Sequence, residues 1–289
     1  MKDLHFLALD GGGTGCRAML CAADGRELGR AMGGGANLTS DFKAAHDNIH
    51  KAIGDVYQAA GLPQSAMSAG VAVLGVAGAD IGNAAARLQA GLGFAKSLVV
   101  SDRDTTIAGV LGQGDGTLAQ IGTGSFFVHR HAGVTRHAGG WGLVLGDECS
   151  GAWLGRELLR ATLRAYDGVD AGSPLAETVM KDFDGDTSQL VLFARDASAA
   201  DFASYAPRLF SANDTGDELA SVILRHAVSD LERTLTALEA ASFPTLYLCG
   251  GVGERYAELL DDTFRARITK PEGDGLGGAL SMAMALHAN

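Results

Sequence analysis

The stretch LALDGGGTGCRAML, residues 7–20, places an acid and a run of glycines between two apolar segments. Residues 5–9 suit one buried strand, which ends at Asp10. We expect Gly11, Gly12 and Gly13 to turn the backbone with positive φ and to approach a ligand closely, with Thr14 adding a hydroxyl. Residues 17–21 then form a second strand. Such a turn offers N–H groups to an anion, and the acid beside it suits a hydrated magnesium ion, although a tight hairpin capped by Asp10 is the simpler alternative.

The same pattern occurs a second time. Residues 118–130, LAQIGTGSFFVHR, again run from an apolar strand through a glycine-rich turn into a second strand. The turn consists of Gly122, Thr123, Gly124 and Ser125. Two similar hairpins about one hundred residues apart indicate an internal duplication. If they face each other across a cleft, they are suited to hold the two ends of one polyphosphate.

Length and composition set the broad class. A chain of 289 residues predicts two α/β domains, which we place at residues 1–112 and 113–289, with a helical insertion at about 151–240. The net charge of -11 argues against nucleic acid or an anionic membrane as a main partner. No stretch reads as a signal peptide or a membrane span, and the four cysteines form no CxxC pair. We therefore expect a cytoplasmic protein with reduced thiols.

Two further polar residues stand where ligands bind in α/β proteins. Asp102 follows the apolar strand of residues 98–101, and acids at the carboxyl ends of parallel strands face the ligand site of open sheets. A salt bridge between Asp102 and Arg103 is the competing interpretation. Asn37 follows a glycine run and offers an amide donor and an acceptor to a polar ligand. Alternatively, Asn37 bonds its own backbone, as loop asparagines commonly do.

Two glycine-rich segments complete the candidate site. The segment AGGWGLVLGDECSGAWLG, residues 138–155, combines Trp141, Gly142 and Asp147, and its carboxylates and flat indole suit sugar hydroxyls. Asp147 as a plain helix cap is the alternative. Gly250 and Gly251 follow the strand of residues 245–249, where a flat ring can lie against the backbone, although a simple strand-to-helix turn fits nearly as well. A GxGxxG match at residues 273–278 is attributed to chance, because too little chain follows it.

The order of these motifs resembles the BadF/BadG/BcrA/BcrD-type ATPase family within the actin, Hsp70 and sugar kinase fold. The resemblance covers nearly the whole chain: DGGGT at 10–14, Asp102, GTGS at 122–125, GGWG and GDE at 139–148, GGV at 250–252 and GAL at 278–280. It is strongest toward N-acetylglucosamine kinases and bacterial glucosamine kinases. The implied fold is a two-lobed, ribonuclease H-like α/β structure with duplicated mixed sheets, flanking helices and a cleft between the lobes.

The resemblance also implies a role for each motif. The cofactors would be ATP and Mg²⁺, with Asp10 holding the metal through water and the 11–14 turn contacting the terminal phosphates. The 122–125 turn would hold the other side of the phosphate chain, and the glycines at 250–251 would lie against adenosine. Asp102 would accept the proton of the sugar 6-hydroxyl as it attacks the γ-phosphate. Asn37, Trp141, Gly142 and Asp147 would line the sugar site.

Some alternatives and departures accompany this reading. One branch of the family activates 2-hydroxyacyl-CoA dehydratases and benzoyl-CoA reductase through an iron–sulfur cluster that bridges a dimer, and a non-catalytic sugar sensor is a third possibility. The scattered cysteines disfavour the activator branch. The resemblance leaves open which sugar is accepted, and a homodimer is our expectation. Cys149 stands where many relatives carry glycine.

Overall fold

The computed structural model describes residues 4–242 and 244–288 and divides the chain into two compact α/β units. Unit 1 comprises residues 1–114 and 271–289, and unit 2 comprises residues 115–270. The C-terminal segment thus belongs to unit 1, whereas the expected division placed it in the second lobe. The reason is that helix α11 (Gly275–Ala288) packs its apolar residues on the sheet of unit 1.

Unit 1 is built on a five-stranded mixed sheet in the order β3-β2-β1-β4-β5. Its first three strands form an antiparallel meander, whereas β4 and β5 run parallel to β1. β4 is buried along its whole length, as a central strand covered on both faces should be. The strands are β1 (His5–Gly11), β2 (Cys16–Ala22), β3 (Glu27–Gly33), β4 (Val71–Val76) and β5 (Lys96–Val100).

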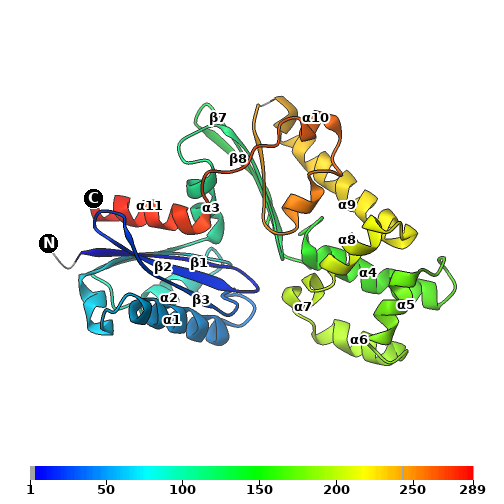
Figure 1. Cartoon of the computed structure of the whole chain (residues 1–289), viewed down its shortest axis with the longest axis horizontal. Helices are drawn as coiled ribbons and strands as arrows, with labels where there is room; N and C mark the ends of the chain where they lie inside the picture. Colours follow the sequence, from blue (N-terminus) through cyan, green and yellow to red (C-terminus); the bar gives the residue numbers. More distant parts are fainter. Residues whose placement is uncertain (1–3, 243, 289) are drawn as a thin grey trace. The chain divides into compact units, whose positions relative to one another are not determined.

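Helices cover both faces of this sheet, as Figure 1 shows. Alternate residues of β1 point to opposite faces: Leu7 and Leu9 pack in the core that includes α1, whereas Phe6 and Ala8 pack in the core that includes α11. The face of α1 also carries α2, and the face of α11 also carries α3. These elements are α1 (Phe42–Ala59), the 3-10 helix η1 (Gln64–Ala69), α2 (Ala84–Gln89) and α3 (Asp102–Val110).

Glycines allow α3 and α11 to pack backbone against backbone. A Cβ atom on Gly278 would lie 1.9 Å from the carbonyl oxygen of Thr105, and one on Gly109 would lie 1.9 Å from that of Asp274. Gly273 approaches the carbonyl of Gly109 in the same way. The formal GxGxxG pattern therefore contains glycines that this helix contact requires. The contact places the start of α11 beside Thr106 and Gly109, in the second half of α3.

Unit 2 repeats the strand arrangement of unit 1. Its four-stranded sheet has the order β8-β7-β6-β9, with an antiparallel meander from β6 to β8 and with β9 parallel to β6. The corresponding strands of unit 1 have the order β3-β2-β1-β4, so the shared topology supports the duplication expected from the two hairpins. The strands are β6 (Gly116–Ile121), β7 (Ser125–His131), β8 (Val134–Gly139) and β9 (Leu246–Cys249).

Most of unit 2 outside the sheet is helical, and its core joins the sheet to α4 and α9. Ile121 and Phe127 from the strands share this core with Leu158 of α4 and Leu231 of α9. The α-helices are α4 (Gly151–Tyr166), α5 (Pro174–Lys181), α6 (Thr187–Asp196), α7 (Ala199–Ala203), α8 (Ala206–Asp214), α9 (Glu218–Ala237) and α10 (Asp262–Arg265). Two 3-10 helices, η2 (Ala240–Ser242) and η3 (Gly253–Tyr256), flank β9.

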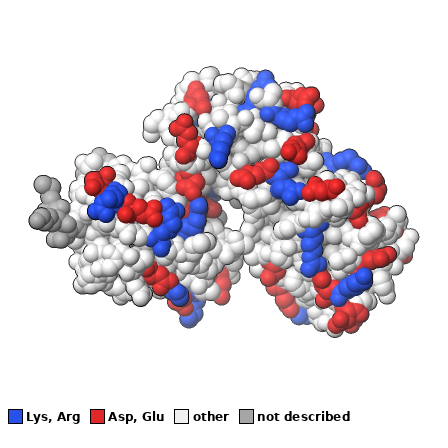
Figure 2. All heavy atoms as spheres, viewed as in Figure 1, with Lys and Arg blue, Asp and Glu red and all other residues white. Residues whose placement is uncertain are grey.

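The surface carries charges of both signs. On the face that Figure 2 presents, Lys and Arg side chains are interspersed with Asp and Glu. Many charged side chains of the protein form short-range pairs, such as Lys51 with Asp55 and Arg164 with Asp170. Among the described residues, no helix has the length and apolar character needed to cross a bilayer.

Candidate functional site

The first glycine turn joins β1 to β2 and contacts the loop after β3. The carbonyl of Gly12 accepts a hydrogen bond from the Ala36 N–H at 2.8 Å, and a Cβ atom on Gly11 would lie 2.8 Å from the Cβ of Ala36. The expected positive φ is not observed at Gly11 or Gly12. Glycine is needed at position 11 because the neighbouring loop approaches so closely. Thr14 is exposed at the tip of the turn.

Asn37 lies between two anchored residues of that loop. The N–H of Ala36 is held by Gly12, and the N–H of Leu38 donates to the carbonyl of Ala77, directly after β4. The side-chain oxygen of Asn37 accepts hydrogen bonds from the N–H and the hydroxyl of Thr39, at 2.9 and 2.7 Å. The Asn37 side chain therefore does bond its own loop, and its NH₂ group donates no hydrogen bond to another residue within 4–242 and 244–288.

Asp102 is the first residue of α3 and directly follows β5 and Ser101. Burial raises the pKa of its carboxyl to about 6, and the negative charge of Asp10 adds to the effect. The Ser101 hydroxyl donates to the carboxylate at 3.3 Å. Arg103 forms its ion pair with Asp80, and within residues 4–242 and 244–288 Asp102 has no ion-pair partner. The salt bridge that competed with a ligand-facing role for Asp102 is thus absent from the described chain.

Asp10 and Asp102 lie at the same edge of the sheet. β1, β4 and β5 are parallel neighbours, so their carboxyl ends meet there, and the two carboxylates interact electrostatically. Asp10 has an ion-pair partner that sequence reasoning missed. This partner is Arg17, which lies directly opposite Asp10 in the β1–β2 register at 2.6 Å. Counting the register across the hairpin would have found this pair.

The second glycine turn joins β6 to β7 in unit 2, and Asp147 lies against it. A Cβ atom on Gly124 would lie 2.8 Å from a carboxylate oxygen of Asp147, and backbone hydrogen bonds from Ser125 and Gly142 reach that carboxylate. Burial nevertheless raises the pKa of Asp147, and the nearby charge of Glu148 acts in the same direction. Asp147 therefore joins the GTGS turn to the GGWG loop, and Ser150, not Asp147, caps α4.

The start of α4 is bonded to the same turn. The N–H of Gly151 donates to the carbonyl of Gly122 at 2.8 Å, and that of Ala152 donates to the carbonyl of Thr123 at 3.1 Å. The Ser125 hydroxyl donates to the carbonyl of Glu148 at 2.9 Å. The turn, the acidic segment and the helix start form one hydrogen-bonded assembly.

Trp141 lies in an exposed loop that begins where β8 ends. Its side chain is 74% exposed, and Val144 and Leu145 beside it are also exposed. Gly142 has a φ of 80°, which favours glycine. The guanidinium of Arg156 donates to the carbonyl of Leu143 at 2.8 Å and ties the loop to α4. An indole exposed in this way has a flat apolar face free for a ligand.

The two glycines after β9 have different surroundings. Gly250 has a φ of 82°, and a Cβ atom there would lie 2.3 Å from the carbonyl oxygen of Ile121, the last residue of β6. A Cβ atom on Gly251 would meet nothing within 4 Å. Gly250 is thus required by the fold of unit 2. Gly251 leaves open backbone against which a flat ring can lie.

Cys149 occupies a backbone position suited to glycine. Its φ is 59°, in the left-handed region, and its carbonyl accepts a hydrogen bond from the Tyr256 hydroxyl at 2.7 Å. We therefore expect Cys149→Gly to be more stable than Cys149→Ala by about 1 kcal/mol, because glycine relieves the backbone strain. Urea unfolding of both variants measures the difference, and an alanine variant at least as stable as the glycine variant would refute the strain.

The candidate residues thus form two groups, one in each unit. Unit 1 brings together the β1 turn, Asn37 and Asp102. Unit 2 brings together the GTGS turn, the Trp141 loop, Asp147 and the glycines after β9. Sequence reasoning missed Arg17 and Asp274, which pair with each other at 2.8 Å. No sequence signal links these two, because 257 positions separate them.

The residues present suit a nucleotide with a divalent cation. The Asp10 carboxylate lies at the strand end, and hard cations such as Mg²⁺ prefer such oxygen ligands. The glycine turns expose backbone next to it in unit 1 and at the end of β6 in unit 2. Among the described residues, no cluster of three or more His, Cys, Asp or Glu side chains forms a protein-only metal site.

The chain is similar to known sugar kinases over nearly its whole length. Glucosamine kinase GspK of Vibrio cholerae is 30% identical over 281 residues, which cover 96% of this chain and 95% of that protein. N-acetyl-D-glucosamine kinase of Dictyostelium discoideum is 25% identical over 285 residues, 90% of this chain and 89% of that protein. A crystal structure from Chromobacterium violaceum, described provisionally as an N-acetylglucosamine kinase, is 34% identical with a TM-score of 0.89 and covers 96% of this chain and 98% of that one.

The match extends to the family level. The model of the BadF/BadG/BcrA/BcrD ATPase family matches residues 7–280, which include every candidate site residue from Asp10 to Gly251. The fold agrees as well, because two mixed sheets flanked by helices are shared with the Chromobacterium structure along nearly the whole chain. The chain belongs to the BadF/BadG/BcrA/BcrD ATPase family.

Proposed function

We propose that this protein is an ATP-dependent amino-sugar kinase, which transfers the γ-phosphoryl group of ATP to the 6-hydroxyl of glucosamine or N-acetylglucosamine. Asp102 carries the proposal, because an enclosed carboxyl with a pKa of about 6 at the carboxyl end of β5 suits a general base. The similarity over nearly the full length to kinases of these two sugars supports the substrate class.

In the proposed reaction, the Asp102 carboxylate accepts the proton of the sugar 6-hydroxyl. That oxygen forms a bond to the γ-phosphorus as the bond between this phosphorus and the bridging oxygen breaks, and ADP leaves. Positioning and charge neutralisation do most of the catalysis in phosphoryl transfer. A magnesium ion near Asp10 would neutralise part of the phosphate charge when the nucleotide is bound.

The remaining candidate residues bind the two substrates. The 11–14 turn and the 122–125 turn offer N–H groups and hydroxyls to the phosphates, and Gly251 offers open backbone to adenosine. The sugar is bound by the NH₂ group of Asn37, the indole of Trp141, the backbone at Gly142 and the carboxylate of Asp147. In this arrangement, Asp147 serves the sugar and also holds the GTGS turn in place.

The cysteines give no support to the redox-activator alternative. A cluster shared between two subunits needs thiols at the surface of each subunit, whereas Cys16, Cys21, Cys149 and Cys249 are all buried. Burial also raises the pKa of Cys16, Cys21 and Cys149, which disfavours the thiolate form that ligates iron. We propose that the protein forms the homodimer expected from the sequence, and that no iron–sulfur cluster is shared between its two subunits.

The pKa of Asp102 predicts how the rate depends on pH. The base must be ionised in the free enzyme, so we expect kcat/KM to fall about tenfold per pH unit below about pH 6 and to be level up to pH 8. Protonation of an ordinary aspartate would lower the rate only near pH 4. Initial rates between pH 4.5 and pH 8, with the fold checked by circular dichroism, test this prediction, and a flat profile down to pH 5 would contradict it.

ADP release tests the proposed function and separates the candidate substrates. We expect turnover with Mg²⁺-ATP to depend on an added amino sugar, in a panel of glucosamine, N-acetylglucosamine, N-acetylmannosamine and glucose. The sugar with the highest kcat/KM identifies the substrate. If no sugar in the panel increases ADP release above the basal rate, the kinase proposal is wrong.

A further inference from the structure

Arg17 is held between two carboxylates at the edge of the β1–β2 hairpin. One guanidinium nitrogen lies 2.6 Å from Asp10 Oδ2, and the other lies 2.8 Å from Asp274 Oδ2. The side chains of Arg17 and Asp10 are 40% and 21% exposed. The pair is therefore partly shielded from water, and its charges act on their surroundings more strongly than those of a fully exposed pair.

The position of this pair follows from the sheet. Phe6, Ala8 and Asp10 point to the same face of β1, and the first two contact the apolar side of α11. Asp10 is thus the charged residue at the end of an apolar row on this face of the sheet. Its partner in the register is Arg17, and side chains directly opposite each other on antiparallel strands are close enough to interact.

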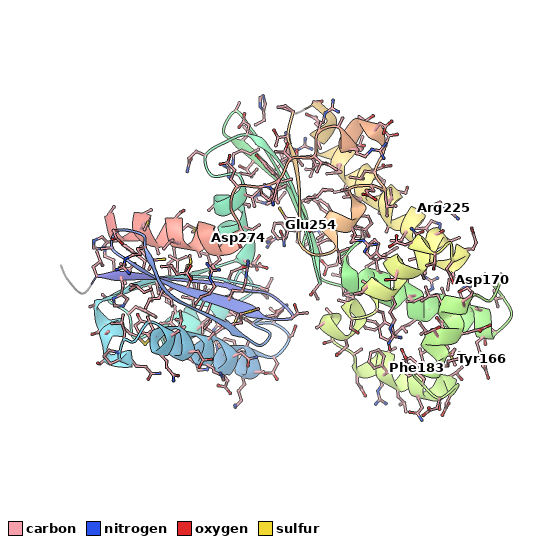
Figure 3. All side chains as sticks on the ribbon, viewed as in Figure 1. Tyr166, Asp170, Phe183, Arg225, Glu254 and Asp274 are labelled. Carbon is pink, nitrogen blue, oxygen red and sulfur yellow. The ribbon has the colours of Figure 1, made fainter. Side chains whose placement is uncertain are left out.

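Asp274 anchors the other side of Arg17. Its Oδ1 accepts a hydrogen bond from the Gly277 N–H at 2.9 Å, so it caps the start of α11, where Figure 3 labels it. Gly275 follows, and a Cβ atom there would lie 2.8 Å from Asp10 Oδ1. The Asp10 carboxylate is therefore enclosed by Arg17 on one oxygen and by the start of α11 on the other.

We propose that Arg17 is a positioning residue that acts as the built-in counter-ion of Asp10. Without nucleotide, its charge offsets the repulsion between Asp10 and Asp102 and reduces the attraction of Asp10 for a free cation. With nucleotide bound, the phosphates supply the additional negative charge, so the cation and the nucleotide bind together. Asp274 takes up part of the positive charge of Arg17 and thereby sets the strength of this effect. The inference rests on the proposed role of Asp10.

Binding of ADP with and without Mg²⁺ measures this effect. The relevant quantity is the coupling ratio, the Kd of ADP in EDTA divided by its Kd in saturating Mg²⁺. Arg17→Gln removes a positive charge beside the phosphates, which weakens metal-free binding more than metal-bound binding. We expect the coupling ratio to rise about tenfold, the order of magnitude for the loss of one partly shielded charge near a phosphate.

A second variant is expected to change the ratio in the opposite direction. Asp274→Asn keeps a side-chain oxygen for the cap of α11 but removes a negative charge, so more of the charge of Arg17 acts on Asp10. We expect the coupling ratio to fall about threefold. Arg30→Gln is the matched control, since Arg30 lies on β3 of the same sheet, pairs with Glu27 and acts on Asp274 only as a weaker charge without a direct contact. It should change the ratio less than about twofold.

Isothermal titration calorimetry on the full chain, with circular dichroism to confirm folding, distinguishes the outcomes. Opposite shifts for the Arg17 and Asp274 variants support the inference. A ratio within twofold of wild type for Arg17→Gln, or an equal rise for Arg30→Gln, overturns it. If Arg17→Gln does not fold, the coupling ratio of Asp274→Asn decides. A ratio equal to or higher than that of wild type then overturns the inference.

Failure of the proposed role of Asp10 has a different signature. In that case, wild-type protein would bind ADP equally well with and without Mg²⁺, or Asp10→Asn would keep the wild-type coupling ratio. A normal wild-type ratio that Asp10→Asn abolishes, together with an unchanged ratio for Arg17→Gln, overturns only the inference about Arg17.

Discussion

Asp102→Asn is expected to lower kcat about 10³-fold, because the amide cannot accept the proton of the attacking hydroxyl. Asparagine has nearly the same shape as aspartate, so the substitution leaves the enclosed surroundings of residue 102, including Asp10, in place. ADP should therefore bind with an affinity within a few-fold of wild type. Steady-state ADP release and calorimetric ADP binding measure the two effects separately. Asp104→Asn is the matched control, because Asp104 lies in the same first turn of α3 but is exposed, and its activity should be near wild type.

The same substitution is expected to stabilise the fold. The pKa of Asp102 is higher in the folded protein than in an unfolded chain, so the ionised carboxylate destabilises the fold above pH 6. At pH 8, Asp102→Asn should raise the free energy of unfolding by roughly 1–2 kcal/mol, and the gain should vanish as the pH falls toward 4. If Asp102→Asn keeps most of its activity, Asp102 is not the base. If Asp102→Asn is less stable than wild type at pH 8, burial of the ionised Asp102 carboxylate does not destabilise the fold.

Gly251→Leu is expected to weaken ATP binding at least tenfold without unfolding the protein. A Cβ atom at this position meets no protein atom within 4 Å, so the leucine occupies only the space proposed for adenosine. Gly172→Leu is the control, because Gly172 in unit 2 has the same open surroundings and should bind ATP like wild type. Calorimetric titration with ATP measures both, and unchanged affinity for Gly251→Leu would remove Gly251 from the nucleotide site.

Gly250→Ala, unlike Gly251→Leu, is expected to destabilise the fold. The added methyl group would collide with the carbonyl of Ile121, and its φ of 82° is unfavourable for alanine. We expect the free energy of unfolding to fall by about 2–4 kcal/mol. Urea unfolding measures the loss, and a Gly250→Ala variant as stable as wild type would show that the turn after β9 relaxes at little cost.

The fold could be predicted where its signals are local in the sequence. The two hairpins were found because apolar runs flank glycine turns, and the strand order β3-β2-β1-β4 recurs as β8-β7-β6-β9. Asp10 and Asp102 were placed correctly at strand ends, because an acid directly after an apolar run marks the end of a buried strand. Their electrostatic interaction follows from the parallel neighbours β1, β4 and β5.

Features that depend on distant contacts could not be predicted in this way. The return of α11 to unit 1 depends on its packing against Phe6 and Ala8 and on the glycine contact with α3, which no local pattern indicates. The ion pair of Arg17 with Asp274 depends on the same packing. The prediction of a positive φ at Gly11 was wrong. Glycine is also selected where another segment passes too close for a side chain, and here Ala36 lies that close to Gly11.

Identification of the phosphorylated product tests the central claim most directly. Wild-type protein is incubated with Mg²⁺-ATP and the preferred amino sugar, and ³¹P–¹H correlation NMR then locates the new phosphate. The account predicts one sugar phosphate whose phosphorus couples to the two protons on C6, formed in equal amount to ADP. A phosphorus that couples to the anomeric proton, or ADP accompanied only by inorganic phosphate, would contradict it.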